Sequence, residues 1–406
     1  MSDHSLEADM DNPEGSPPHL LTLEDLPDII ILSICNFLDA HVINMLMQMS
    51  MRFNHLLSGD HYWRMRIGHR WPKLYPAIPV DPFDWQQACV EREHAHKVWT
   101  NVDDCLEHFT YNAGLFASVD AVHLMQDGQL LATGSRDRYL SLLNLQKYDV
   151  NKPTSKGDMK IYSNCKIHKG WIWSIKSLDN VLATASWDTY IRRLDLNADL
   201  TMIDNFKCKS AVLDIHIEPN GIIAAGYDSR LYLVDPREGA VTSMKIHKRP
   251  VLCLSVDDHF IVSGSEDKTI SVFDRTAGKV MKTVELESFP MCLHCMDNQL
   301  WIGDKGGKLN LCDTTGGVFH LVDTYEVGHL GKVTGIVSTR GALYTCSTDR
   351  TVKILEPTRN PDTINTLTSH TGDVAGISYQ NRVLASAGSD VCVGIWRPKP
   401  TDVLTL

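Results

Sequence analysis

Cysteine and glycine residues are the first candidates for chemistry in this sequence. Cys292 and Cys295 have the spacing of a zinc-binding pair, but they fall in an expected strand, where residues three apart point to opposite faces, and no second pair follows at ligand spacing. The glycine-rich segment 303–307 contains a lysine, yet it precedes an expected strand and lacks the spacing of a phosphate-binding loop. Neither a Gly-x-Ser-x-Gly nor a His-Glu-x-x-His motif occurs. We therefore predict no catalytic residue, no metal site and no cofactor.

Aspartates recur in a regular setting, each after a short run of small residues. An aspartate accepts hydrogen bonds from the amides of a tight turn and is favoured beside Gly or Ser. These residues are Asp137, Asp188, Asp228, Asp267, Asp349 and Asp390, at intervals of 51, 40, 39, 82 and 41 residues. The interval of 82 contains one degenerate copy, in which Gly306 takes the place of the aspartate. The sequence therefore contains seven copies of one repeat.

Each copy is expected to form four short strands, as in 260–265 followed by 269–273, which alternate like half-buried or buried strands. A repeat of about 40 to 45 residues with four strands is typical of the WD40 β-propeller. The pattern resembles that family over residues 97–397. Because only ten residues follow Trp396, we expect a strand from residues 97–113 to complete the last blade.

The resemblance to WD40 proteins also implies a partner for the turn aspartate. In that family it bonds a histidine of the loop that enters the same blade. An apolar strand start follows each candidate within three to five residues; the candidates are His168, His247, His329 and His370. The Trp of the dipeptide that names the family is kept only at Trp396, but apolar residues fill that position in the other copies.

The same resemblance places the turns and the entering loops on one rim of the propeller. Aromatic rings beside guanidinium groups are typical of binding hot spots, and positive side chains can receive an acidic or phosphorylated segment. The candidates for binding a protein substrate are Arg136, Arg138, Trp171, Trp173, Trp187, Tyr227, Arg230, Lys268 and Arg350, with Lys169, Lys305 and Lys308 on the same rim. The alternatives are that the cations are solvated charges and that Trp171 and Trp173 belong to the core of the second blade.

A second region, residues 23–63, precedes the propeller. Pro27 suits the first position of a helix, and eight of the residues 28–38 are apolar and surround the helix on all sides. Such a helix must be covered on more than one side, and a segment of about 40 residues cannot supply that cover from its own core. Part of this surface is therefore expected to meet another protein or the next domain.

The residues of this region resemble an F-box. The resemblance rests on a Leu-Pro opening, two short helices with regularly spaced apolar residues, a Ser-x-Arg-Phe step and a closing Trp. F-boxes dock on the S-phase kinase-associated adaptor of cullin–RING ubiquitin ligases. The resemblance implies contacts to that adaptor, or direct supports of them, at Leu26, Pro27, Ile30, Ile34, Leu38, Leu46 and Trp63. The alternative is a small helical cap folded onto the propeller.

The connector between the two regions is expected to be stiff. Its first half is rich in proline and aromatic residues, and residues 85–97 have a helical pattern with Glu and Arg alternating on the exposed side. A stiff connector would hold a bound target at a fixed reach, whereas a Gly/Ser tether would not.

Composition and charge limit the classes of function. The net charge is −11, but residues 1–51 contain nine acidic residues and no Lys or Arg, so the rest of the chain is close to neutral. A near-neutral propeller without a basic run argues against nucleic-acid binding. Eleven scattered cysteines, an odd number, argue against a disulfide framework and for a reducing compartment. No signal peptide opens the sequence and no apolar stretch reaches the roughly 20 residues of a membrane span, so we expect a cytoplasmic or nuclear protein without a membrane partner.

The predicted fold class is multidomain. We expect a disordered acidic N-terminus at 1–20, an all-α F-box at 21–65, a helical connector at 66–97 and an all-β, seven-bladed WD40 propeller at 98–400. The whole chain resembles the F-box/WD-repeat family. That resemblance implies a non-catalytic, substrate-recognition subunit of a cullin–RING (SCF-type) E3 ubiquitin ligase, with the adaptor, the cullin and a protein substrate as partners. The alternative is a WD40 scaffold that assembles complexes without ubiquitin transfer.

Overall fold

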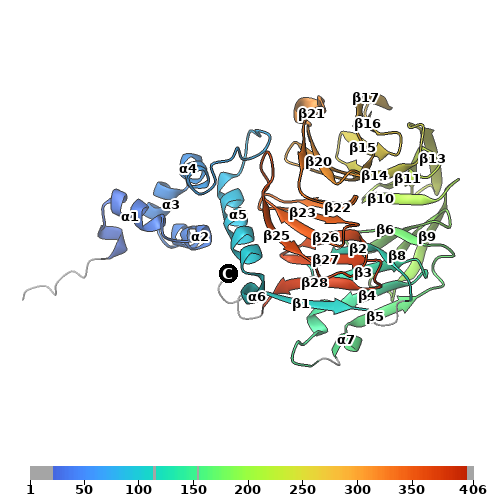
Figure 1. The fold of residues 1–406 in the computed structure, drawn as a ribbon, viewed down its shortest axis with the longest axis horizontal. Coiled ribbons are helices and arrows are strands. Elements are labelled where there is room, and N and C mark those ends of the chain that lie inside the picture. Colours follow the sequence, from blue (N-terminus) through green and yellow to red (C-terminus); the bar gives the residue numbers. More distant parts are fainter. Residues whose placement is uncertain (1–21, 113–115, 153–154, 400–406) are drawn as a thin grey trace, which may run out of the picture.

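A helical domain, a long helix and a propeller follow one another along the chain (Figure 1). The structure is a computed structural model, and it describes residues 22–112, 116–152 and 155–399. The segment 1–20, for which the sequence predicts disorder, lies outside the described residues. The combination of N-terminal helices and a propeller confirms the predicted fold class.

The helical domain consists of η1 (Leu23–Asp25), α1 (Asp28–Cys35), α2 (Ala40–Met49), α3 (Met51–Leu57) and α4 (Asp60–Arg70). Pro27 precedes α1 as its N-cap, one position before the expected one, and its carbonyl oxygen accepts the first helical hydrogen bond. Ile43, Leu57 and Trp63 are fully buried in a core that also contains Tyr75 and Phe83 of the connector. The helical domain therefore completes its core with residues from the next segment, as expected for so short a domain.

The connector continues into α5 (Trp85–Thr100) and α6 (Val102–Cys105), and α5 stands between the helical domain and the propeller (Figure 1). The expectation that its Glu and Arg residues are exposed is wrong for Arg92 and Glu93, which are buried. The reason is that α5 is covered on two sides. Ala88 and Cys89 pack into the helical domain, whereas Ala95 and Trp99 pack against the sixth and seventh blades.

The propeller has seven blades, each an antiparallel sheet of four strands. In the first six blades the strands follow the chain from the inside outwards, whereas the outermost strand of the seventh comes from the segment before the first blade. Blades one to four contain β2 (Val119–Met125), β3 (Leu130–Ser135), β4 (Leu140–Asn144) and β5 (Lys160–Asn164); β6 (Ile172–Leu178), β7 (Val181–Ser186), β8 (Tyr190–Asp195) and β9 (Thr201–Lys207); β10 (Val212–Glu218), β11 (Gly221–Gly226), β12 (Arg230–Asp235) and β13 (Ala240–Lys245); and β14 (Val251–Val256), β15 (Phe260–Ser265), β16 (Thr269–Asp274) and β17 (Lys279–Glu285). Short helices η2 (Leu145–Lys147) and α7 (Ser155–Asp158) lie between β4 and β5.

Blades five to seven contain β18 (Pro290–Met296), β19 (Gln299–Asp304), β20 (Lys308–Asp313) and β21 (His320–Glu326); β22 (Val333–Ser338), β23 (Leu343–Ser347), β24 (Val352–Leu355) and β25 (Thr363–Leu367); and β26 (Val374–Gln380), β27 (Val383–Gly388), β28 (Val393–Pro398) and β1 (Leu106–Tyr111), with η3 (Thr315–Gly317) after β20. The second and third strands of a blade are its most buried, as β15 and β16 illustrate. The strand predicted within 97–113 is β1, which pairs antiparallel with β28 from Leu106 opposite Pro398 to Tyr111 opposite Val393. An N-terminal strand thus closes the ring on the C-terminal blade.

The hydrophobic core of the propeller lies between neighbouring blades. Tyr232, Trp301 and Tyr344 are among the largest fully buried side chains. Blades approach so closely that a Cβ at Gly134 of β3 would lie 2.5 Å from the Ile172 side chain of the next blade. Within the described residues, no helix has the length and apolar character needed to cross a bilayer.

Candidate functional site

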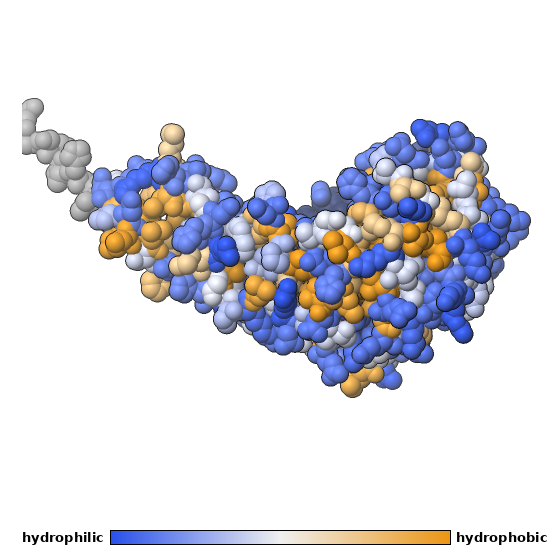
Figure 2. All heavy atoms as spheres, turned by 90° about the horizontal axis from the view of Figure 1, so that it is seen from above, coloured by the Kyte–Doolittle hydropathy of each residue, from blue (hydrophilic) through white to orange (hydrophobic). Residues whose placement is uncertain are grey.

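The helical domain exposes hydrophobic side chains on α1, in the turn that follows α1 and on α2. Ile30, Ile34 and Phe37 follow one another at helical spacing, and 90% of Phe37 is exposed. Val42, Met45 and Met49 form a similar row along α2 and are also exposed. Figure 2 shows hydrophobic residues gathered on this domain, to the left of the propeller. Uncovered apolar residues at this density mark a surface that another protein covers.

The predicted adaptor contacts fall into three groups. Pro27, Ile30 and Ile34 are exposed, and Leu26, Leu38 and Leu46 are half-buried. Trp63, in contrast, is 0% exposed. Of the two roles that the resemblance implies, contact with the adaptor and support of the contacting residues, only support fits a buried side chain. The half-buried residues pack against the core that contains Trp63 and leave part of their side chains at the surface.

A buried ion pair fixes the helical domain to α5. The Arg66 guanidinium donates to the Glu93 carboxylate at 2.6 and 3.1 Å, and to the backbone carbonyls of Cys35 and Leu38 at the end of α1. Glu93 also accepts from the Ala40 amide at the start of α2, at 2.7 Å. One carboxylate on α5 therefore bonds α4 and the start of α2 directly, and Arg66 extends the network to the end of α1, which makes the junction rigid.

A second buried arginine fixes α5 and the connector to the propeller. The Arg92 guanidinium lies 4.4 Å from the centre of the Trp71 ring and 4.6 Å from that of Tyr75, and it pairs with Glu356 at 3.2 Å. Next to it, α5 passes so close to blade six that a Cβ at Gly341 would lie 2.6 Å from the Glu91 carbonyl oxygen. The position of α5 on the ring is thus set by close packing as well as by charge.

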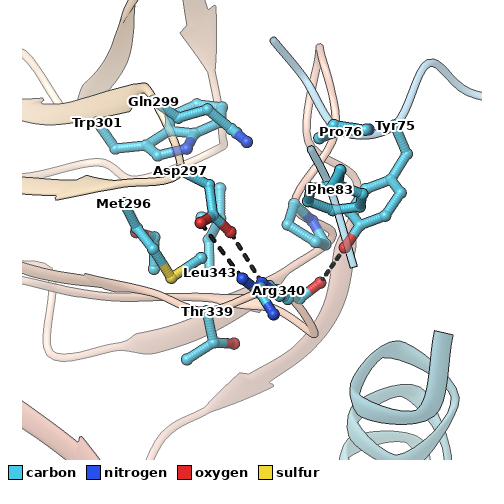
Figure 3. A pocket seen from close by; sticks show the side chains of 12 residues that line it. Tyr75, Pro76, Phe83, Met296, Asp297, Gln299, Trp301, Thr339, Arg340 and Leu343 are labelled. Carbon is cyan, nitrogen blue, oxygen red and sulfur yellow. Dashed lines mark hydrogen bonds and ion pairs between the residues drawn. The ribbon is translucent and has the colours of Figure 1, made fainter. Parts of the chain in front are cut away.

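Figure 3 shows where the connector meets blades five and six. The Tyr75 hydroxyl donates to the Arg340 carbonyl oxygen at 2.8 Å, and the Arg340 side chain pairs with Asp297 at 2.9 Å. The guanidinium also lies 5.7 Å from the centre of the Phe83 ring. The cavity between these groups holds ≈ 10 Å³, about the room of one water molecule, so it is a packed joint and not a ligand site.

Four of the turn aspartates bond a histidine twenty residues earlier, as the family resemblance implied. The Nδ1 atoms of His168, His247, His329 and His370 lie 2.8–3.2 Å from the carboxylates of Asp188, Asp267, Asp349 and Asp390. Burial alone would raise the pKa of Asp349, but hydrogen bonds from Thr351, His329 and the Leu330 amide outweigh it and lower that pKa to about 2. Burial lowers the pKa of the His329 ring, which keeps the ring neutral.

Blades three and five replace this pair in different ways. In blade three, Cys208 occupies the histidine position and the Tyr232 hydroxyl donates to Asp228 at 2.7 Å, while the other carboxylate oxygen of Asp228 has no hydrogen-bond partner among the described residues. In blade five, Gly306 occupies the aspartate position, and Asp304, two residues earlier, accepts from the Lys308 amide at 2.9 Å. The turn keeps an acceptor although the repeat is degenerate.

The turns surround the mouth of a central channel of ≈ 640 Å³. In every blade the amide of one turn residue donates to the carbonyl that precedes the first strand, at 2.8–3.1 Å. We call these seven turn residues the inner ring; they are Arg136, Trp187, Tyr227, Glu266, Lys305, Thr348 and Ser389. The inner ring is therefore built by identical backbone geometry, and only the side chains differ from blade to blade.

Aromatic side chains gather at blades two and three. The Trp187 ring lies 6.0 Å from Trp171, 6.3 Å from Trp173 and 5.3 Å from Tyr227, measured between ring centres. Trp171, Trp187 and Tyr227 are 41%, 42% and 49% exposed, and Trp173 lines the channel. The alternative that places Trp171 and Trp173 in the core of blade two is therefore wrong. We call these four residues the aromatic cluster.

The structure does not gather the predicted cations in one place. Arg136 meets the aromatic cluster with its guanidinium 5.1 Å from the centre of the Trp171 ring, but one donor edge, Nε with one terminal nitrogen, binds both oxygens of Asp120, at 2.8 and 3.1 Å. Arg230 pairs with Asp228 at 3.6 Å. Arg138, Lys268 and Arg350 follow the turn aspartates of blades one, four and six, so at least one blade separates each from the next.

Comparison with known proteins identifies the kind of protein that carries these two surfaces. A bovine protein, F-box/WD repeat-containing protein 9, is 36% identical over 390 residues, which cover 95% of this chain and 84% of the relative. The human protein of the same name is 35% identical over 94% of this chain and 83% of its own length. The chain belongs to the F-box/WD repeat-containing protein family. The WD domain, G-beta repeat, family matches residues 239–274, and a Caenorhabditis elegans F-box/WD repeat-containing protein, mec-15, is 25% identical over 68% of the chain and 70% of its own length.

The F-box of this family member exposes apolar residues that the motif comparison missed. They are Ile29, Phe37, Val42, Met45, Met49 and Met51. The signal was present in the sequence, since residues 28–38 are apolar on all sides of the helix. Once Ile31 and Cys35 face the core and Leu32 packs at its edge, Ile29, Ile30 and Ile34 remain exposed among the described residues.

The cysteine pair of this F-box/WD repeat protein has a packing role. Cys292 is buried against blade six, with its Sγ 3.5 Å from the Val333 carbonyl oxygen, and burial raises the pKa of its thiol well above the usual range. Burial also raises the pKa of Cys295, to about 11. Among the described residues, no three His, Cys, Asp or Glu side chains are grouped as metal ligands.

Proposed function

We propose that the chain is the substrate-recognition subunit of a cullin–RING E3 ubiquitin ligase of the SCF type. In this proposal the helical domain binds the S-phase kinase-associated adaptor, and through it the cullin, while the mouth of the propeller binds the protein to be ubiquitinated. Catalysis belongs to the other subunits. The proposal places the protein in the cytosol, the nucleus or both.

The observation that carries the proposal is the exposed apolar surface of α1 and α2, on a helical domain that α5 holds rigidly against the propeller. Family membership supports an F-box at this position, and F-boxes dock on that adaptor. Arg66, Glu93 and Arg92 fix this surface relative to the propeller through buried ion pairs. A ligase receptor needs such a rigid connection, because it must present a bound protein at a constant distance from the ubiquitin-carrying enzyme.

The test is co-purification of the full chain with the adaptor and the cullin. We expect the wild type to bind, and the double variant Ile30→Glu/Phe37→Glu to lose binding by at least about 100-fold, because two charges would be placed in an apolar interface. Point variants suit this test better than removal of residues 1–64, which would uncover Tyr75 and Phe83.

The matched control is Met202→Glu/Met281→Glu, which adds the same charges at exposed apolar positions on the outer strands β9 and β17. This control should bind the adaptor like the wild type. Failure of the wild type itself to bind would contradict the proposal and favour a scaffold that assembles complexes without ubiquitin transfer.

A further inference from the structure

The mouth of the propeller contains a second set of equivalent positions outside the inner ring. They lie two residues before each carbonyl that accepts an inner-ring amide, in the loop that enters the blade. We call them the outer ring; they are Phe116, Lys169, Lys209, Lys248, Glu287, Leu330 and Thr371. In five blades the turn aspartate fixes this residue by accepting its backbone amide, as Asp188 does from Lys169 and Asp267 from Lys248, at 2.8 and 2.9 Å.

The outer ring carries lysines in three consecutive blades, two, three and four. All three side chains are exposed, and none has an ion-pair partner among the residues that the structure describes. The aromatic cluster occupies the inner side of the same sector on blades two and three. On blade four the inner-ring residue is Glu266, which is not aromatic. An aromatic anchor point and a row of uncompensated positive charge therefore lie next to each other on blades two to four.

We propose that this sector binds a protein segment with one aromatic or large aliphatic side chain followed by carboxylates. The apolar side chain would pack on Trp187 and Tyr227, and Asp or Glu residues would pair with Lys169, Lys209 and Lys248. This inference rests on the proposed function, and it names the chemistry of the substrate that the ligase receptor recognises.

Charge and geometry favour carboxylates over a phosphate group. A phosphate site usually contains guanidinium groups that converge on one anion, with two donors each. The arginine at the aromatic cluster, Arg136, already donates to both oxygens of Asp120. The three lysines are single positive charges, one on each blade, which suits a row of separate carboxylates better than one doubly charged group.

The test is selection from a display library of random dodecapeptides on the purified full chain. We expect the enriched peptides to share one Trp, Phe, Tyr or Leu with two or more Asp or Glu residues on one side. Trp187→Ala/Tyr227→Ala should weaken their binding by about 30-fold or more, because rings at the centre of an interface dominate its affinity. Lys169→Glu/Lys209→Glu/Lys248→Glu should weaken it by about tenfold and select peptides with Lys or Arg in place of the acids.

The matched control is Arg138→Glu/Lys268→Glu/Arg350→Glu, which reverses the same number of charges on the same rim but outside the row. Its effect should stay below about threefold. Equal effects of the two triple variants, enriched peptides without Asp or Glu, or no enriched peptide at all would overturn the proposal. Because the adaptor is absent from this assay, such a failure is separate from a failure of adaptor binding, which co-purification measures.

Discussion

The F-box and the mouth of the propeller expose hydrophobic residues in different ways. The F-box leaves mainly aliphatic and thioether side chains uncovered at neighbouring positions of α1 and α2, together with one aromatic ring, Phe37, after α1. The mouth combines four aromatic rings with charged groups such as Arg136, Asp120 and Glu266. Apolar surfaces of the first kind are typical of permanent assemblies, and mixed surfaces of the second kind are typical of partners that exchange. On the proposed function, the first surface would serve the constant adaptor and the second the changing substrates.

The largest expected effect comes from breaking the junction that separates these two surfaces. Arg66→Ala removes the buried guanidinium from the Glu93 carboxylate and leaves it only the partly exposed Arg70, at 3.1 Å, so we expect a loss of about 3 kcal/mol in the free energy of unfolding. Urea denaturation followed by circular dichroism measures it, and limited proteolysis should show that the F-box is cut before the propeller.

The matched control for the junction is Arg52→Ala, which removes the exposed ion pair between Arg52 and Asp28. Its cost should be about 0–1 kcal/mol. If Arg52→Ala destabilised the protein as much as Arg66→Ala, the buried junction would not be the element that keeps the two surfaces at a fixed distance.

Acid should affect the propeller through two buried imidazole rings. The Nε2 atom of His123 lies 3.1 Å from the Ser177 amide of the next blade, and His294 meets the Ser338 amide in the same way; burial lowers the pKa values of these rings to about 3 and about 4. The unfolded chain takes up these protons near pH 6.5, whereas the folded propeller does not. Stability should therefore fall as the pH drops below about 6.5, by at most about 1.4 kcal/mol per pH unit for each ring.

Urea midpoints at pH 7, 6 and 5 measure this slope. The double variant His123→Gln/His294→Gln should reduce it, because a glutamine does not titrate, while other rings whose pKa burial lowers, such as His94 and His329, still contribute. Replacing the exposed His55 and His61 of the F-box by glutamine should leave it unchanged. An unchanged slope in the first variant would show that other groups cause the loss of stability in acid.

The repeated turns allow a smaller test within the propeller. Asp349 accepts from His329, Thr351 and the Leu330 amide, whereas Asp228 accepts from Tyr232 and keeps one oxygen without a partner. Asp349→Ala should therefore cost about 2–3 kcal/mol and Asp228→Ala about 1 kcal/mol or less. Thermal unfolding of the two variants shows which substitution costs more stability. A larger loss for Asp228→Ala would contradict the interpretation that the turn of blade three is stabilised less than that of blade six.

The smallest expected effect is that of a change at the mouth of the propeller on the binding of the adaptor by the F-box. Trp187→Ala/Tyr227→Ala should leave adaptor binding within about twofold of the wild type, because the two surfaces have no residue in common. Titration of the adaptor against this variant and the wild type measures it. A large change in affinity would mean that the connector transmits a signal between the surfaces and does not only hold them apart.

The sequence predicts the repeated parts of this molecule well and the joints between them poorly. Seven blades follow from periodicity, because each copy repeats the same local geometry. The closing strand follows from the short stretch of chain after Trp396, and the paired Asp and His residues follow from the resemblance to WD40 proteins. The burial of Arg92 and Glu93 was missed, because their partners Glu356 and Arg66 come from opposite directions along the chain. The charged rim was predicted only as a set of residues. Arg138 and Lys169 are both near a turn aspartate. Whether such cations lie side by side depends on which blades carry them and on whether each residue belongs to the outer ring.

The closing strand β1 has a consequence for how this architecture is inherited. Because β1 follows α6 directly and supplies the fourth strand of the last blade, the seam of the ring belongs to the same stretch of chain that carries α5, which holds the F-box. If recombination replaced the N-terminal part of the chain and the break fell after Leu106, β1 would be lost with it. The last blade would then lack its fourth strand, and the ring would be open. Modules can be exchanged without that damage only upstream of β1, so any replacement docking module must be joined to the chain before Leu106.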